Sequence, residues 1–355
     1  MTPAGFLLLP RAFRFIPEEE AVSLPRTMKH LLPLLLTLLF SLTAHAAETL
    51  TVYSGRNERL VGPLYKAFTE KTGIKVKVRY GETPQLAATL LEEGAKTPAD
   101  VFVAQDAGAL GALAKAGLLQ PVPKEQLEKV DARFRSPDGL WVGLSGRARV
   151  VAYNTTKVKP EALPTSILGF TEPAWKGRIG WAPTNGSFQA FVTALRLLKG
   201  DEAAKQWLQG IKANEPRTYK NNAAIIEALG RGEIDVGFVN HYYLYAAKKD
   251  KGEALAVANH FVAAGDPGAL VNVAGAGVLK GTKKAAAAQK LLAFLLDAQA
   301  QKHFAQETFE YPLVPGVQAD ATLVPLEKVG SPQLDLSKLE DLRGTLKLLQ
   351  EAEVL

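Results

Sequence analysis

The regular alternation of strand-like and helix-like segments from residue 50 onward most constrains the fold of this chain. Residues 50–53 are a short apolar strand, and residues 59–72 carry apolar side chains at helical spacing. Residues 74–80 alternate apolar and basic side chains, which predicts a second strand. A helix over 83–94, a strand over 99–104 and a helix over 108–116 follow. This order predicts an α/β fold whose parallel sheet carries helices on its faces.

A second α/β unit follows a break rich in Pro, Lys, Asp and Gly over residues 120–140. A strand over 147–153 leads out of the first unit, and a Gly- and Val-rich segment over 268–278 could return to it. Between them we predict strands at 179–182 and 233–239 and helices at 188–199, 201–214 and 223–230. An alanine-rich helix is predicted over 284–300.

The N-terminal segment is typical of export. Met28-Lys29-His30 is basic, residues 31–42 are apolar, and Ala44-His45-Ala46 is a small-x-small cleavage signature. We therefore expect a signal peptide over 28–46, cleaved near Ala46 and Ala47, and expect 1–27 to be a mis-annotated extension of the reading frame. A retained membrane anchor is the alternative, but the apolar run is short for a bilayer.

The composition excludes several kinds of site. The chain has no cysteine, which excludes disulfides, thiolate metal sites and a lipid-carrying cysteine. An exported chain without that tether is expected in the periplasm, with no integral membrane segment after cleavage. The formal net charge is +6, but the basic residues are scattered, so nucleic-acid binding is not supported.

Polar side chains follow the predicted strands, where ligands of open parallel sheets bind. We expect two groups of strand ends to face each other across a cleft. The positions selected in this way are Ser54 to Asn57, Tyr80 to Thr83, Gln105 and Asp106, Pro183 to Ser187, Asn221 and Asn222, and Asn240 to Tyr243.

Two adjacent tyrosines, Tyr242 and Tyr243, stand at the end of the predicted strand 233–239. A phenol becomes a good metal ligand once ionised, and a hard trivalent ion such as Fe³⁺ can displace its proton near neutral pH. The alternative is a pair of half-buried tyrosines that begin a helix with their hydroxyl groups in water.

At this point the chain resembles the periplasmic ferric-ion-binding proteins of bacterial ABC importers. The resemblance spans essentially all of the chain after the signal peptide. The segments that carry it are Val52 to Arg56, Pro98 to Phe102, Ala116 to Leu119, Trp141 to Val150, Asn240 to Tyr243 and Glu310 to Pro312.

The resemblance implies a two-lobed periplasmic binding protein fold of type II. Each lobe would hold a mixed, mostly parallel sheet with helices on both faces, and hinge strands would join the lobes. One lobe would be 47–149 plus 274–324, and the other 150–273 plus the C-terminal 325–355. The lobes would close around Fe³⁺ held by tyrosinates and a small synergistic anion, carbonate or bicarbonate.

The chain departs from the best-known pattern of this family at two ligand positions. Asn57 stands where several members carry a histidine ligand, and Gln105 where they carry a glutamate ligand. Because Fe³⁺ prefers anionic oxygen ligands, we expect a third phenolate, and Tyr80 is the candidate by its placement. Tyr80 could instead cap the sheet edge, and Tyr153 is a weaker candidate. Asn57, Gln105 and Asp106 could support the ligands, although Asp106 is better explained as a helix N-cap.

The candidate anion-binding residues combine guanidinium groups, amides and a helix start. Planar arginines suit a small oxyanion, and the free N–H groups at the start of a helix favour anions. Each of these residues could also be a cap or a solvated loop residue. The set comprises Arg56, Arg147, Asn185, Gly186, Ser187, Asn222 and Asn240.

Three functional hypotheses follow from these residues. The first is a monomeric periplasmic protein that captures Fe³⁺ and delivers it to an inner-membrane ABC permease. The second keeps the fold but binds an oxyanion or a small organic solute. The third is an enzyme, such as a hydrolase using Ser187. It is disfavoured because the chain has no Gly-x-Ser-x-Gly elbow and no histidine placed as its base.

Overall fold

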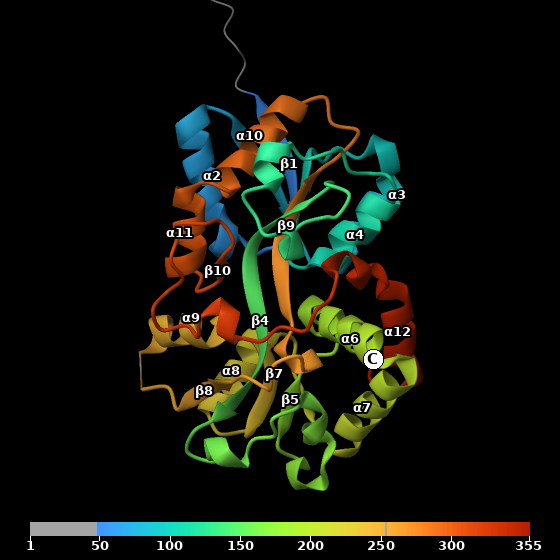
Figure 1. The fold of residues 1–355 in the computed structure, drawn as a ribbon, viewed down its shortest axis with the longest axis vertical. Helices are drawn as coiled ribbons and strands as arrows, with labels where there is room; N and C mark the ends of the chain where they lie inside the picture. The colour runs from blue at the N-terminus through green and yellow to red at the C-terminus, as the bar shows by residue number, and fades with distance from the viewer. Residues whose placement is uncertain (1–47, 253) are drawn as a thin grey trace, which may run out of the picture. The chain divides into compact units, whose positions relative to one another are not determined.

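Two long strands, β4 (Val142–Asn154) and β9 (Val271–Val278), run through the middle of the structure (Figure 1). β4 pairs with strands of both sheets, whereas β9 pairs within the first. They pair antiparallel from Val142 to Ala148 of β4, with a register shift between Gly143 and Ser145. This computed structural model describes residues 48–252 and 254–355. The predicted signal peptide and the extension before it lie outside the described residues.

The first sheet has the order β2-β1-β3-β9-β4. β1 (Thr49–Ser54) pairs in parallel with β2 (Lys75–Tyr80) and with β3 (Val101–Ala104), which confirms the parallel arrangement predicted for these segments. β9 then pairs antiparallel with β3, and β10 (Tyr311–Pro312) pairs antiparallel with β4 at Gly146 and Ser145. The sheet is therefore mixed.

The second sheet is built on the other half of β4. Residues 149–154 of β4 pair antiparallel with β7 (Val236–Asn240) and with β8 (Val257–His260). β7 pairs in parallel with β5 (Ile179–Trp181), and β5 in parallel with β6 (Arg217–Thr218). One strand thus belongs to both sheets. Side chains only two residues apart on β4 therefore lie in different sheets, one in each half of the structure.

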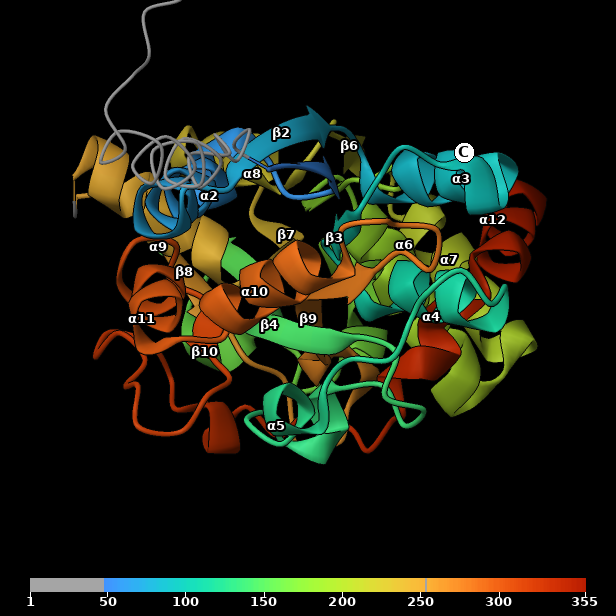
Figure 2. The same ribbon diagram turned by 90° about the horizontal axis from the view of Figure 1, so that it is seen from above.

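Helices cover both faces of these sheets. Figures 1 and 2 both place α2 and α11 on one side of the first sheet and α3 and α4 on the other. The helices are α2 (Glu58–Thr72), α3 (Thr83–Glu93), α4 (Ala107–Lys115), α5 (Lys124–Leu127), α6 (Gly186–Lys199), α7 (Asp201–Ala213), α8 (Asn222–Gly230), α9 (Tyr242–Lys251), α10 (Ala285–Leu295), α11 (Ala298–Gln306) and α12 (Leu342–Glu351).

Three clusters of buried hydrophobic side chains form the interior. Apart from Ala194 of α6, the first cluster takes residues up to Ala148 and residues from Leu270 onward, including Leu336 and Leu339 near the C-terminus. The other two take residues from Val150 to Ala269, together with α12. The exact division into lobes stays a prediction, and the C-terminal residues contribute to more than one cluster.

The prediction of one helix over 284–300 is wrong. The segment forms α10 and α11, which are separated at Leu296 and Asp297. Asp297 is the N-cap of α11, because its carboxylate accepts a hydrogen bond from the backbone N–H of Ala300 at 3.0 Å. Strand β4 also begins five residues before the predicted start, at Val142.

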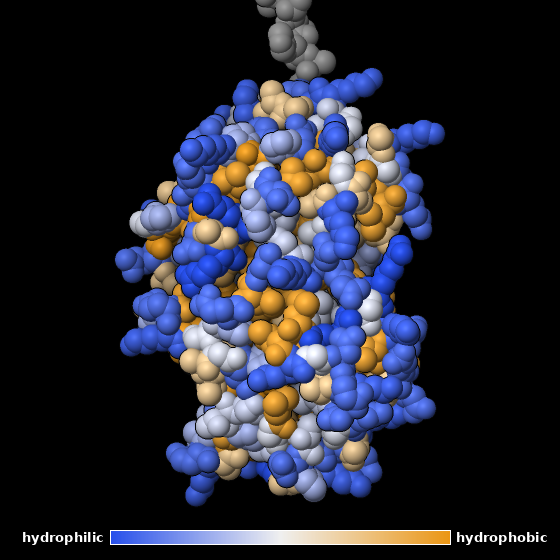
Figure 3. All heavy atoms as spheres, turned by 45° about the vertical axis from the view of Figure 1, so that its right-hand side comes forward, coloured by the Kyte–Doolittle hydropathy of each residue, from blue (hydrophilic) through white to orange (hydrophobic). Residues whose placement is uncertain are grey.

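The visible surface carries charged and polar side chains between small hydrophobic groups (Figure 3). Large exposed hydrophobic side chains are few in the described chain, and they are dispersed, as at Leu91, Leu168 and Leu197. None of the described helices is both long and apolar enough to cross a bilayer.

The C-terminal segment packs tightly on α4, and this contact yields the first prediction. A Cβ atom added at Gly108 would lie 2.2 Å from the carbonyl oxygen of Leu339, in the 3₁₀ turn Leu336–Glu340. We therefore expect Gly108→Ala to lower the free energy of unfolding by about 1–3 kcal/mol, measured by urea denaturation. The control is Gly62→Ala on α2, where the nearest atom is a flexible Glu58 carbon at 3.1 Å. Equal stability of both variants would contradict the packing of this segment on α4.

Candidate metal and anion site

Tyr242 and Tyr243 begin helix α9, directly after strand β7 and His241. Their rings stack, with centroids 4.3 Å apart and an interplanar angle of 27°. Tyr242 is 2% exposed, and its hydroxyl group has no hydrogen-bond partner among the described residues. A buried phenol oxygen without a partner is unusual and indicates a site for a ligand.

The two tyrosines line a hollow of about 410 Å³. Helices from both halves of the structure line it. One wall includes Asn57, Arg59 and Leu60 at the start of α2 and His303 and Glu307 at α11. The opposite wall consists of α8 and α9. The pair of phenol groups therefore lies where the two halves of the structure meet.

Arg56 lies in the turn after β1, with its guanidinium group close to the Tyr242 ring. Gly55 is required in this turn, since a Cβ atom there would lie 1.9 Å from Oγ1 of Thr83. The hydroxyl group of Ser54 donates to the carbonyl oxygen of Arg56 at 2.8 Å and fixes the turn. The Arg56 guanidinium carbon then lies 5.8 Å from the centroid of the Tyr242 ring.

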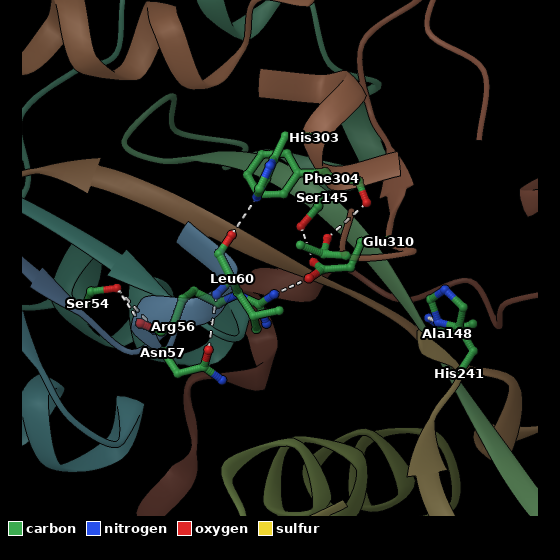
Figure 4. A network of polar contacts seen from close by, with 11 residues as sticks. Ser54, Arg56, Asn57, Leu60, Ser145, Ala148, His241, His303, Phe304 and Glu310 are labelled. Atoms are coloured by element: carbon green, nitrogen blue, oxygen red, sulfur yellow. Dashed lines mark hydrogen bonds and ion pairs between the residues drawn. The ribbon is translucent and has the colours of Figure 1, made fainter. Parts of the chain in front are cut away.

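Arg56 is buried and forms an ion pair with Glu310, whose other oxygen accepts from Ser145 (Figure 4). Burial alone would lower the pKa of Arg56, but the Glu310 carboxylate and the phenol groups of Tyr242 and Tyr243 raise it above its usual value. Its Nε and Nη1 atoms have no partner among the described residues. Arg56 is therefore a fixed cation with two free donor nitrogens.

Arg147 on β4 is 1% exposed, and all three of its side-chain nitrogens lack a hydrogen-bond partner within the described chain. Burial and the neighbouring cation of Arg56 lower its pKa, while Tyr242, Glu310 and Asp106 oppose this shift. A buried cation without a partner is costly, so an anion is expected to bind there.

Arg149 lies two residues further along β4 and was not among the predicted site residues. It donates to the carbonyl oxygen of Phe238 at 3.0 Å and to the hydroxyl oxygen of Ser187 at 3.5 Å. Burial lowers its pKa to about 9, and Arg147 adds to this effect. It adds a third buried guanidinium to the site.

The predicted residues at the start of α6 form one polar cluster. The Asn185 carbonyl oxygen Oδ1 accepts from the Ser187 hydroxyl group at 2.6 Å and from Asn222 at 3.1 Å. Gly186 lies against Pro84 of α3, where an added Cβ atom would be 3.5 Å from Cδ. The structure therefore brings Asn185, Gly186, Ser187 and Asn222 together beside Arg149.

Asn240 and Asp106 come from different elements, Asn240 from the end of β7 and Asp106 from the start of α4. Asn240 pairs with Arg149 in the β7–β4 ladder, and its Nδ2 atom has no partner in the described chain. Asp106 is the N-cap of α4, as predicted, with Oδ1 accepting from Ala109 N–H at 3.2 Å. Burial raises the Asp106 pKa, while Arg147 lowers it.

The structure does not bring Tyr80 to the tyrosine pair. Its hydroxyl oxygen would lie 3.7 Å from a Cβ atom on Gly62 of α2, and it lines a different hollow with Tyr65 and Val78. Burial and the Glu58 carboxylate raise its pKa. Its role as a third ligand was predicted from its place at a strand end and from charge balance, and neither determines the direction of the side chain.

The remaining candidates occupy structural positions. The Asn57 side chain caps α2 by accepting from Leu60 N–H at 3.2 Å, although it also lines the hollow. The backbone N–H of Gln105 donates to Thr83 Oγ1 at 3.0 Å. Tyr153 lies in the second hydrophobic cluster.

Comparison with known proteins supports a binding function. The family model of the bacterial extracellular solute-binding proteins matches residues 64–328. The major ferric iron-binding protein of Neisseria meningitidis serogroup B is 37% identical over 310 residues, covering 86% of this chain and 93% of that protein. The chain belongs to the bacterial extracellular solute-binding proteins.

Two solved solute-binding proteins are similar in structure. Iron-bound HitA from Pseudomonas aeruginosa is 40% identical with a TM-score of 0.83, covering 86% of this chain and 99% of that one. The Trichodesmium protein in complex with iron and citrate is 34% identical with a TM-score of 0.73, covering the same shares. These matches confirm the type II fold and the resemblance to ferric-ion-binding proteins. Members of this family bind solutes and are not enzymes.

Two buried charged residues at the site were not predicted from the sequence as site residues. Glu310 and Arg149 both lie in segments that carried the resemblance, but neither was assigned a role there. Glu310 is 254 residues from Arg56, so no local pattern connects them. For Arg149 a signal existed, since it follows Arg147 at the spacing that places both side chains on one face of a strand.

The free nitrogens of Arg147 yield the second prediction. We expect Arg147→Met to raise the free energy of unfolding by about 1–3 kcal/mol in buffer without bicarbonate or citrate, because a buried charge is removed. The variant should also lose the rise in melting temperature that such anions give the unmodified protein. Urea and thermal denaturation measure both effects.

Arg178→Met is the matched control for this prediction. Arg178 pairs with Asp235 at 2.7 Å, away from the tyrosines, so its loss should not stabilise the protein or alter the anion effect. A destabilised Arg147→Met variant that still responds to anions would contradict an anion site at Arg147.

Proposed function

We propose that this protein captures Fe³⁺ in the periplasm and delivers it, as a monomer, to an inner-membrane ABC permease. Tyr242 and Tyr243 bind the ion as phenolates, and a carbonate- or bicarbonate-type anion completes the coordination. Arg56, Arg147, Asn185, Gly186, Ser187, Asn222 and Asn240 hold that anion.

The observation that carries this proposal is the convergence of buried polar atoms without partners. The Tyr242 hydroxyl, two nitrogens of Arg56 and three of Arg147 are all of this kind in the described chain. A cation alone would be repelled by the arginines, and an anion alone would leave the paired tyrosines without a role. A trivalent cation bound together with an anion matches both sets of groups.

The relatives support iron as the cargo. The proteins compared above are described as ferric iron-binding or iron-bound, and one of them holds citrate with the iron. The described residues contain no group of three or more His, Cys, Asp or Glu side chains that could hold a metal. Two of the carboxylates that line the hollow are paired, Asp250 with Arg59 and Glu307 with Lys249. We therefore infer that the two phenolates are the anionic metal ligands.

The third prediction concerns colour. Protein mixed with ferric citrate and bicarbonate should turn orange-red, because phenolate-to-iron(III) charge transfer absorbs visible light. Tyr242→Phe and Tyr243→Phe should each abolish the band in an absorption spectrum. Tyr245→Phe on the same helix is the control, since the Tyr245 hydroxyl group bonds the Thr322 carbonyl oxygen instead.

Tyr80→Phe tests the third ligand predicted from the sequence. With the Tyr80 hydroxyl group against α2, we expect this variant to keep the colour and the affinity.

A protein that stays colourless but gains thermal stability from oxyanions alone would instead support the alternative, an oxyanion or small-solute binder on the same fold.

The fourth prediction is a pH dependence. Burial and the neighbouring Tyr242 raise the pKa of Tyr243, although Arg56 and Arg147 lower it, so this phenol keeps its proton at neutral pH without metal. Metal binding must release that proton. For each proton released, the iron affinity rises about tenfold when the pH rises by one unit. Iron affinity should therefore rise with pH and fall in acid.

Two measurements check this dependence. Titration with ferric ion in weakly buffered solution should release protons from the protein, and citrate competition at several pH values should show weaker iron binding as the pH falls. Affinity that is constant between about pH 7 and pH 4 would contradict phenolate ligands.

A further inference from the structure

Glu310 is fully buried, and its carboxylate is bound by Arg56 and Ser145. It lies between α11 and β10, where its backbone N–H donates to the Phe304 carbonyl oxygen at 2.8 Å. The next residues, Tyr311 and Pro312, pair with Gly146 and Ser145 of β4. The backbone of Glu310 is therefore held by its own N–H group and by the pairing of the two residues that follow it.

Both carboxylate oxygens of Glu310 are already used. Oε1 binds Nη2 of Arg56, and Oε2 accepts from the Ser145 hydroxyl group (Figure 4). Because a guanidinium is planar, holding one of its nitrogens at a fixed carboxylate restricts the directions of the other two. Those two, Nε and Nη1, are the atoms without partners among the described residues.

The need to neutralise the buried charge of Arg56 does not by itself explain the Arg56–Glu310 pair. Arg147 is buried to the same degree in the same site, and no acid among the described residues is hydrogen-bonded to it. The fold therefore tolerates a buried arginine that no carboxylate holds. What differs at Arg56 is that its guanidinium lies 5.8 Å from the Tyr242 ring centroid, so its direction affects the iron site directly.

We propose that Glu310 is a positioning residue for iron capture. Together with Ser145 it holds Arg56 so that Nε and Nη1 face the anion and the Tyr242 oxygen. This inference rests on the proposed function. Residues that orient the groups around a metal without binding it typically change metal affinity about 10- to 100-fold when they are replaced.

The test compares iron affinity in Glu310→Gln, Arg56→Met and the double variant by citrate competition. We expect Glu310→Gln to weaken binding about 10- to 100-fold and to shift the charge-transfer band. In the Arg56→Met background, Glu310→Gln should have almost no further effect, because it acts through Arg56. Additive losses would overturn the proposal, as would an unchanged affinity in Glu310→Gln.

Two further variants keep the test informative. Ser145→Ala removes one partner of Glu310 without touching the tyrosines, and it should weaken iron binding in the same direction but less. Asp100→Asn is the matched control for a buried carboxylate, since Asp100 bonds Lys284 and Thr282 away from the site. It should change stability without moving the band.

The outcomes separate this inference from the proposed function. An unmodified protein that takes up no ferric ion would overturn the proposed function. An unmodified protein that binds iron, with Glu310→Gln binding it equally well, would overturn only the role of Glu310. A Glu310→Gln protein that does not fold would leave Ser145→Ala as the deciding variant.

Discussion

The site depends on one constraint: it holds more buried positive charges than carboxylates bound to them. Arg56, Arg147 and Arg149 are each at most 4% exposed, and Glu310 is the carboxylate bound to one of them. Charges of this kind are unfavourable in the interior unless a partner is bound. Under the proposed function, a bound anion would relieve this unfavourable interaction, and the relief would contribute to the affinity.

Strand β4 positions two of these arginines, Arg147 and Arg149. Arg147 pairs with Asn272 of β9 in the first sheet, and Arg149 pairs with Asn240 of β7 in the second. Because alternate residues of a strand point to the same face, both guanidinium groups face the same side. A single strand that crosses between two sheets thus holds two cations at the junction of the halves, where the tyrosines begin α9.

Much of the fold could be predicted from sequence because it depends on local patterns. The spacing of apolar residues located α2 and β2 closely, and strand ends selected Arg56 and Tyr242 for the site. The break between α10 and α11 was missed because alanine-rich sequence favours a continuous helix, whereas Asp297 caps a new one. The Arg56–Glu310 pair and the direction of Tyr80 depend on contacts that sequence alone does not determine.

Under the proposed function, the same charges explain why the site would prefer a trivalent ion. The Tyr243 phenol resists ionisation because its burial and the neighbouring Tyr242 raise its pKa. A metal must therefore bind strongly enough to displace the protons, and hard ions of high charge do this best. The arginines then stabilise the phenolates and the anion together. Selectivity would follow from competition between metal and protons, without any carboxylate or histidine cluster among the described residues.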